Sequence, residues 1–192
     1  MDREKDKNPS AKAGEQKRKG RRAYLEDIRR SPDGKYVYTG AQYTYDKLNP
    51  RTLVLIRLWA LALPAAVACI ASGCLSTPFT RDVWYVIGPL AFELASLGSV
   101  VWAVCRITGN GDTLREYVRK QTFGSLPLRC GFTIAFAAIG LVGAAVYMIF
   151  FGSAQDGITA ADIAYLALKA VNIACCSIIL PYSKHVRWQK TG

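Results

Sequence analysis

The class of this chain is decided by residues 52–72, which read TLVLIRLWALALPAAVACIAS. Only one of these 21 residues, Arg57, carries a charge, and it lies near the start of the stretch. A helix needs about 20 mostly apolar residues to cross the roughly 30 Å hydrocarbon core of a bilayer. A long arginine side chain near a helix end can reach back to the membrane surface. The stretch therefore predicts a membrane-spanning helix.

Three further stretches have the same character, with lengths of 23, 22 and 21 residues. They cover residues 83–105, 130–151 and 162–182. Ten residues separate the first stretch from the second, and ten separate the third from the fourth. Such short connections make consecutive helices antiparallel neighbours. We expect an all-α membrane protein, with a four-transmembrane-helix up-down-up-down bundle in residues 52–182.

Lysine and arginine are distributed unevenly between the two ends of these helices. Fourteen precede the first helix, five lie between the second and third helices, and three follow the last helix. The other two connections hold one and none. Positively charged loops of multispanning proteins stay on the cytoplasmic side. Both termini are therefore predicted to be cytoplasmic (N-in, C-in), in a multi-pass protein of the cell membrane.

Residues 1–34 form a basic arm with little apolar surface to bury, so we expect a largely disordered cytoplasmic chain. Nucleic acid is not its expected partner, because the arm is tethered to a membrane. A cluster in this arm would attract anionic lipid headgroups by about 1 kcal/mol per charge near the surface. A topology signal without any ligand explains the cluster equally well. Its members are Lys17, Arg18, Lys19, Arg21 and Arg22.

Four tyrosines distinguish residues 35–51. Tyr36 and Tyr38 share one face of an extended chain, and Tyr43 and Tyr45 share another. A Thr-Gly-Ala turn separates the two pairs, so the pattern predicts a short β-hairpin. An isolated hairpin is marginal in water, and we expect this one at the membrane interface. Its tyrosines would be interfacial anchors or would line a peptide-docking site.

Two more segments are expected on the cytoplasmic side. Residues 113–122 open with the capping-box spacing of Thr113 and Glu116, and continue with an apolar stripe opposite basic residues. This pattern predicts an amphipathic helix at the membrane surface. Residues 183–192 are predicted to be a cytoplasmic tail.

A resemblance to a known group rests on two short motifs and on the layout of the spans. The motifs are Tyr36-Val-Tyr-Thr-Gly40 before the first span and Leu114-Arg-Glu-Tyr117 after the second span and its Gly-rich connection. Together they resemble small bacterial four-helix membrane proteins that have no assigned activity. The resemblance implies a bacterial cytoplasmic membrane and implies nothing about function.

Polar residues inside the predicted spans are candidates for a site. Glu93 lies ten residues from Val83, a depth of about 15 Å along a helix. Lys169 lies seven residues from Asp162, the outer boundary of the fourth span, which is a depth of about 10 Å. Asn172 lies one turn further, at about 15 Å on the same helix face. A lone charge at this depth costs at least about 2.5 to 3.5 kcal/mol. We therefore expect Glu93 and Lys169 to face each other across the interface of the second and fourth helices.

This pair has two possible roles. Polar contacts between membrane helices often serve only to hold the helices together. The same geometry could instead shift the pKa of Glu93 towards neutrality and make it a proton site. Small residues at regular spacing mark faces for close packing, within the bundle or in a homo-oligomer. They are Ala91, Ala95, Ser99 and Ala103, then Ala137, Gly140 and Ala144, then Ala170, Ala174 and Ser177.

The sequence contains no catalytic, metal-binding or nucleotide-binding pattern, so we expect neither an enzyme nor a cofactor. The expected function is a non-enzymatic interaction protein, either a scaffold or an accessory subunit with a protein partner. The alternative is a small proton-coupled transporter built around Glu93, which would be oligomeric because four helices enclose little volume.

Overall fold

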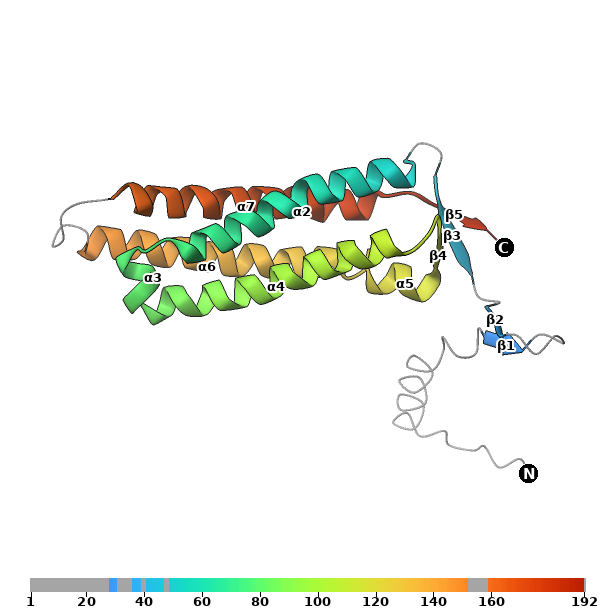
Figure 1. Cartoon of the computed structure of the whole chain (residues 1–192), viewed down its shortest axis with the longest axis horizontal. Helices are drawn as coiled ribbons and strands as arrows, with labels where there is room; N and C mark the ends of the chain where they lie inside the picture. Colours follow the sequence, from blue (N-terminus) through green and yellow to red (C-terminus); the bar gives the residue numbers. More distant parts are fainter. Residues whose placement is uncertain (1–27, 31–35, 39–40, 47–48, 152–158, 192) are drawn as a thin grey trace, which may run out of the picture.

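Four long helices lie side by side in the computed structural model of this chain (Figure 1). All four are long and apolar enough to cross a membrane, which confirms the prediction of four such helices. The bounds of each helix differ from the predicted range by at most four residues at either end. The helices are α2 (Arg51–Cys74), α4 (Trp84–Gly109), α6 (Leu126–Phe151) and α7 (Ala160–His185). The structure describes residues 28–30, 36–38, 41–46, 49–151 and 159–191.

Consecutive long helices run in opposite directions (Figure 1). Helix α2 packs on α4 and α7, and α6 packs on the same two helices, so α4 and α7 lie diagonally opposite each other. The short helix α3 (Pro78–Asp82) joins α2 to α4, and its first turn is closed by a hydrogen-bonded capping box between Thr77 and Thr80.

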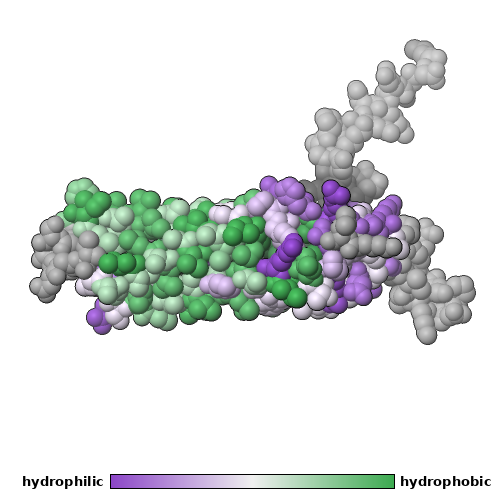
Figure 2. Space-filling view, turned by 90° about the horizontal axis from the view of Figure 1, so that it is seen from above, coloured by the Kyte–Doolittle hydropathy of each residue, from purple (hydrophilic) through white to green (hydrophobic). Residues whose placement is uncertain are grey.

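The surface of the bundle is apolar and its interior holds polar side chains. Large hydrophobic residues on all four helices are exposed, and the space-filling view shows them as a band over the helical part of the molecule (Figure 2). Glu93, Lys169, Asn172 and Thr133 have no exposed surface. A soluble protein buries its apolar residues and exposes its charges. This inverted distribution is typical of helices surrounded by lipid.

The small-residue faces are used unequally. On α6, Ala137, Gly140 and Ala144 are all buried against neighbouring helices, as their spacing predicts. On α7, in contrast, the three small residues are exposed, and the side chains that pack inward lie on the opposite face. The stripe on α4 is mixed, with Ala91 exposed and Ala103 buried.

A three-stranded antiparallel sheet covers one end of the bundle (Figure 1). Its central strand is β3 (Gln42–Tyr45), which directly precedes α2. The edge strands are β4 (Thr113–Arg115), which follows α4, and β5 (Trp188–Thr191), which follows α7. Tyr43 lies opposite Leu114 on one side and Lys190 on the other. Segments far apart in the sequence are thus joined at this end, which we call the strand end.

The predicted hairpin within residues 35–51 is wrong. Strand β2 (Tyr36–Tyr38) pairs with β1 (Ile28–Arg30), so Tyr36 and Tyr38 are not partners of Tyr43 and Tyr45. Strand β3 pairs instead with β4 and β5, because α4 and α7 both end beside it. Three strands on an apolar support are more stable than an isolated pair.

The predicted helix over residues 113–122 is also corrected. Its first residues, Thr113–Arg115, are strand β4, and the helix α5 is only Glu116–Gln121. The capping box expected from Thr113 does not form because that residue pairs with Thr44 in the sheet. The predicted tail, residues 183–192, also differs from the structure. Helix α7 continues to His185, and residues 188–191 form strand β5.

Aromatic rings attach the sheet to the helices. The ring of Trp188 on β5 lies 4.8 Å from that of Tyr45 and 4.8 Å from that of Phe123, which precedes α6. Arg51, the first residue of α2, donates to the carbonyl oxygens of Thr108 and Asn110 at 2.9 and 2.8 Å. Those carbonyls lie at the C-terminal end of α4 and would otherwise lack a partner within the helix. The strand end therefore attaches the segment before α2 and the segment after α7 to the bundle.

Replacing Trp188 with Ala should destabilise the bundle. Removing a fully buried Trp costs about 3 to 5 kcal/mol, and we expect about 2 kcal/mol here because Trp188 is half-buried. Unfolding by dodecyl sulfate in mixed micelles measures the change. Lys190→Ala, an exposed position on the same strand, is the control. Equal stability of the Trp188→Ala and Lys190→Ala proteins would contradict a role of the sheet in holding the helices.

Candidate functional site

A buried polar centre lies inside the bundle. Lys169 on α7 donates a hydrogen bond from its Nζ to Oε2 of Glu93 on α4. Asn172, one turn further along α7, donates from Nδ2 to the second carboxylate oxygen, Oε1, at 2.5 Å. None of the three side chains has exposed surface. Each oxygen of the carboxylate therefore accepts a hydrogen bond, and its charge is balanced within the protein.

The sequence placed these three residues at matching depths, and the structure brings them together. Lys169 and Asn172 are three positions apart, so they share one face of α7. The expected interface between the second and fourth helices is wrong, however, since α4 and α7 are diagonal and each packs on α2 and α6. The contact crosses the middle of the bundle instead. A long lysine and a glutamate can span that distance where short side chains could not.

An aromatic wall lies beside the ion pair. The ring of Tyr165, one turn before Lys169, is 5.2 Å from the lysine Nζ and packs 5.0 Å from the ring of Phe79. Within the described residues its hydroxyl has no hydrogen-bond partner although it is buried. A side chain on Gly140 of α6 would contact this hydroxyl, because an added Cβ would lie 3.5 Å from it.

On the other side, Cys176 lies one turn beyond Asn172. Its thiol is 3.6 Å from the side-chain oxygen of Asn172, so the amide is engaged at both of its ends. All six cysteines are free, and Cys69, Cys130 and Cys176 are buried. Buried thiols of this kind pack as small hydrophobic groups.

The chemistry available to this centre is limited by its burial. A general base must come within hydrogen-bond reach of a substrate proton, and here Glu93, Lys169 and Asn172 have no exposed surface. No group of three or more His, Cys, Asp and Glu residues able to hold a metal occurs in the part of the chain that the structure describes. The arrangement is suited to fastening α4 to α7.

A second polar network, which the sequence analysis did not identify, joins α4 to α6 nearer the strand end. Arg129 donates from Nη1 to the carbonyl oxygen of Ser99 at 2.7 Å, and from Nε to the hydroxyl of Ser125 at 3.1 Å. The guanidinium groups of Arg129 and Arg106 each lie 5.2 Å from the ring of Trp102. Sequence reasoning counted Arg129 only as a loop charge. The nearby hydroxyls of residues 96, 99 and 125 were the available signal.

The other predicted site residues have different outcomes. The basic cluster in residues 17–22 lies outside the described residues. Tyr36 and Tyr38 are on β2, whereas Tyr43 and Tyr45 are partly buried in the sheet. The guanidinium of Arg119 lies 4.2 Å from the ring centre of Tyr43. Burial raises the pKa of Tyr45 to about 12, so its phenol is neutral at physiological pH. Tyr43 and Tyr45 are thus packed within the protein.

Comparison with protein-family models, curated proteins and solved structures finds no match to this chain.

The ion pair generates a prediction about stability. Removing either charge leaves the other buried without a partner, which lowers the free energy of unfolding by about 3 to 5 kcal/mol. Glu93→Gln and Lys169→Met should therefore each destabilise strongly. The double variant Glu93→Gln/Lys169→Met leaves no charge and should recover most of the loss, as measured by a double-mutant cycle in mixed micelles. Additive effects of the two substitutions would show that the residues do not interact.

Proposed function

We propose that this chain is an N-in, C-in integral membrane protein with a non-enzymatic interaction role, as a scaffold or accessory subunit. The observation that carries the proposal is the buried carboxylate of Glu93, which is paired within the protein. Lys169 and Asn172 each donate to one of its oxygens, and none of the three side chains has exposed surface, which supports a role of this pair in holding the bundle together. The groups left to meet other molecules lie at the strand end.

The composition of the strand end supports this proposal. Hydrophilic residues gather there on the visible face, next to the apolar band of the helices (Figure 2). Arg187, Gln189 and Lys190 are exposed on or beside strand β5. A partner at a membrane surface would meet a firm sheet here, because β3 is held by strands from both sides.

The orientation is argued from charge. The strand end carries the segments that precede α2, connect α4 to α6 and follow α7, and these segments hold most of the lysines and arginines of the chain. Retention of positive charge on the cytoplasmic side would place this end in the cytoplasm. A bacterial cell membrane follows from the resemblance to small four-helix membrane proteins.

A proton-coupled carrier is the second candidate, and two observations favour it. Pro89 lies one turn before Glu93 and cannot donate a backbone hydrogen bond, and the Tyr165 hydroxyl beside the ion pair lacks a partner in the described chain. Helix breaks and unpaired polar groups near a buried carboxylate occur along proton pathways. A carrier would need Glu93 to release its partners during each cycle, and such a protein would work as an oligomer.

Labelling of single cysteines tests the orientation. In a cysteine-free background, Asn110→Cys, Asp156→Cys and Lys190→Cys should behave differently towards an impermeant thiol reagent added to intact cells. Only position 156, between α6 and α7, should react, because the other two positions belong to the cytoplasmic side. Reaction of all three after membrane permeabilisation is the control. Labelling of position 110 or 190 in intact cells would contradict the N-in, C-in orientation.

Purification in mild detergent separates the two functions. We expect a partner at fixed stoichiometry in native mass measurement, and we expect the double variant Arg187→Glu/Lys190→Glu to lose it, because charge reversal removes complementarity at the strand end. Arg81→Glu, an exposed position at the opposite end, is the matched control and should keep the partner. A homodimer with a bound small molecule and no partner would instead support the carrier.

A further inference from the structure

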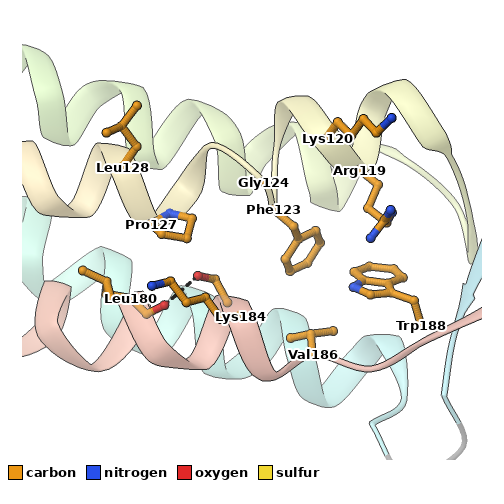
Figure 3. Close-up of a pocket in the computed structure, with 11 residues that line it drawn as sticks. Arg119, Lys120, Phe123, Gly124, Pro127, Leu128, Leu180, Lys184, Val186 and Trp188 are labelled. Carbon is orange, nitrogen blue, oxygen red and sulfur yellow. Dashed lines mark hydrogen bonds between the residues drawn. The ribbon is translucent and has the colours of Figure 1, made fainter.

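An open groove of about 650 Å³ lies between α5, the start of α6 and the end of α7 (Figure 3). Gly124 forms the turn that shapes one wall, where an added Cβ would lie 2.5 Å from the carbonyl oxygen of Lys120. Strand β5 closes the far end with the Trp188 ring. The groove is a separate feature from the buried centre around Glu93.

The groove is positively charged. Arg119 and Lys184 line it from opposite walls, and no acidic residue is among those that line it. Lys120 also belongs to the rim, but its ammonium points away in Figure 3 and pairs with Glu116 at 2.6 Å. Arg119 and Lys184 therefore supply the charge available to a ligand.

The Arg119 side chain is held in place by the ring of Tyr43. Its guanidinium lies against Tyr43 and is directed towards Trp188 in Figure 3. Its buried Nε has no hydrogen-bond partner among the described residues. Because the stack restricts the side chain, little conformational entropy is lost when the guanidinium binds an anion. A phosphate fits a planar guanidinium better than a point-like group does.

The other part of the groove is apolar. Leu128 on α6 is 64% exposed, and together with Pro127 and Leu180 it lines the side that continues into the apolar surface of the helices. In Figure 3 the Lys184 side chain extends towards this side, below Pro127. Cationic and apolar walls thus meet along a single groove. A soluble anion would gain no binding free energy from the apolar wall.

We propose that this groove binds one anionic phospholipid, with the headgroup phosphate against the Arg119 guanidinium, the Lys184 ammonium adding positive charge further along the groove, and an acyl chain along Leu128 and Leu180. The proposal rests on the proposed placement of the strand end at the membrane surface. Charge complementarity selects an anionic lipid over a zwitterionic one. Continuity with the apolar surface selects a lipid over a soluble phosphate.

The test titrates the full-length protein in detergent with phosphatidylglycerol or phosphatidylcholine of identical acyl chains, and counts bound lipid by native mass spectrometry. We expect one site that prefers phosphatidylglycerol. Lys184→Gln should weaken binding about fivefold, the factor that one surface cation contributes towards anionic lipid. Lys184→Arg should retain it. Arg187→Gln is the matched control, since it removes the same charge three residues away from an exposed position that does not line the groove.

Three results would overturn the proposal. One is no headgroup preference, and another is an equal loss in Lys184→Gln and Arg187→Gln, which would indicate diffuse attraction. The third is displacement of the lipid by millimolar glycerol phosphate, which would indicate a site for a soluble anion. The assay needs neither a protein partner nor a known membrane orientation. Its failure is therefore distinguishable from failure of the proposed interaction function.

Discussion

The contact between Glu93 and Lys169 is the interaction on which the bundle depends. A charge inside a bilayer must be paired or neutralised, and here the pairing joins the two helices that do not pack directly on each other. Side-by-side packing through small residues, such as Ala137 and Ala144 on α6, fixes neighbouring helices. The ion pair adds a direct link between α4 and α7. The four helices are thereby held in one arrangement around a dry polar centre.

The strand end is stabilised by strand pairing and aromatic packing rather than by a buried ion pair. Outside the hydrocarbon, water competes for every hydrogen bond, so short segments there cannot stay ordered alone. The chain combines three of them into one sheet and packs their rings on each other, as Tyr45, Trp188 and Phe123 show. Arg51 adds a bond to the last carbonyls of α4. Polar contacts near the middle of the helices and aromatic contacts at the strand end therefore act on the same helices at different heights.

The sequence alone predicts the features that depend on the length of apolar stretches and on the depth of a residue within a helix. The four spans follow from apolar length, and the meeting of Glu93 with Lys169 follows from the cost of a lone charge at a computable depth. The sheet does not follow, because the partners of Tyr43 are residues 114 and 190, and no local pattern reveals such distant pairs. The network of Arg129 was missed for a similar reason. Arg129 was counted as a charge that sets the orientation, but it also makes specific hydrogen bonds. Only the packing of α4 on α6 shows which atoms it bonds.

The central position of β3 has a consequence for biosynthesis. The ribosome makes β3 before either of its partners in the sheet, and β5 (Trp188–Thr191) is made only after the four long helices. Helix α2 is therefore synthesised long before the strand that precedes it can be fully paired. A chain that stops before β5 leaves one side of β3 open, with unpaired backbone groups available to other extended chains. Closure of the sheet thus waits for the translation of β5, and a chain without β5 differs from the whole sheet in the backbone groups that it exposes.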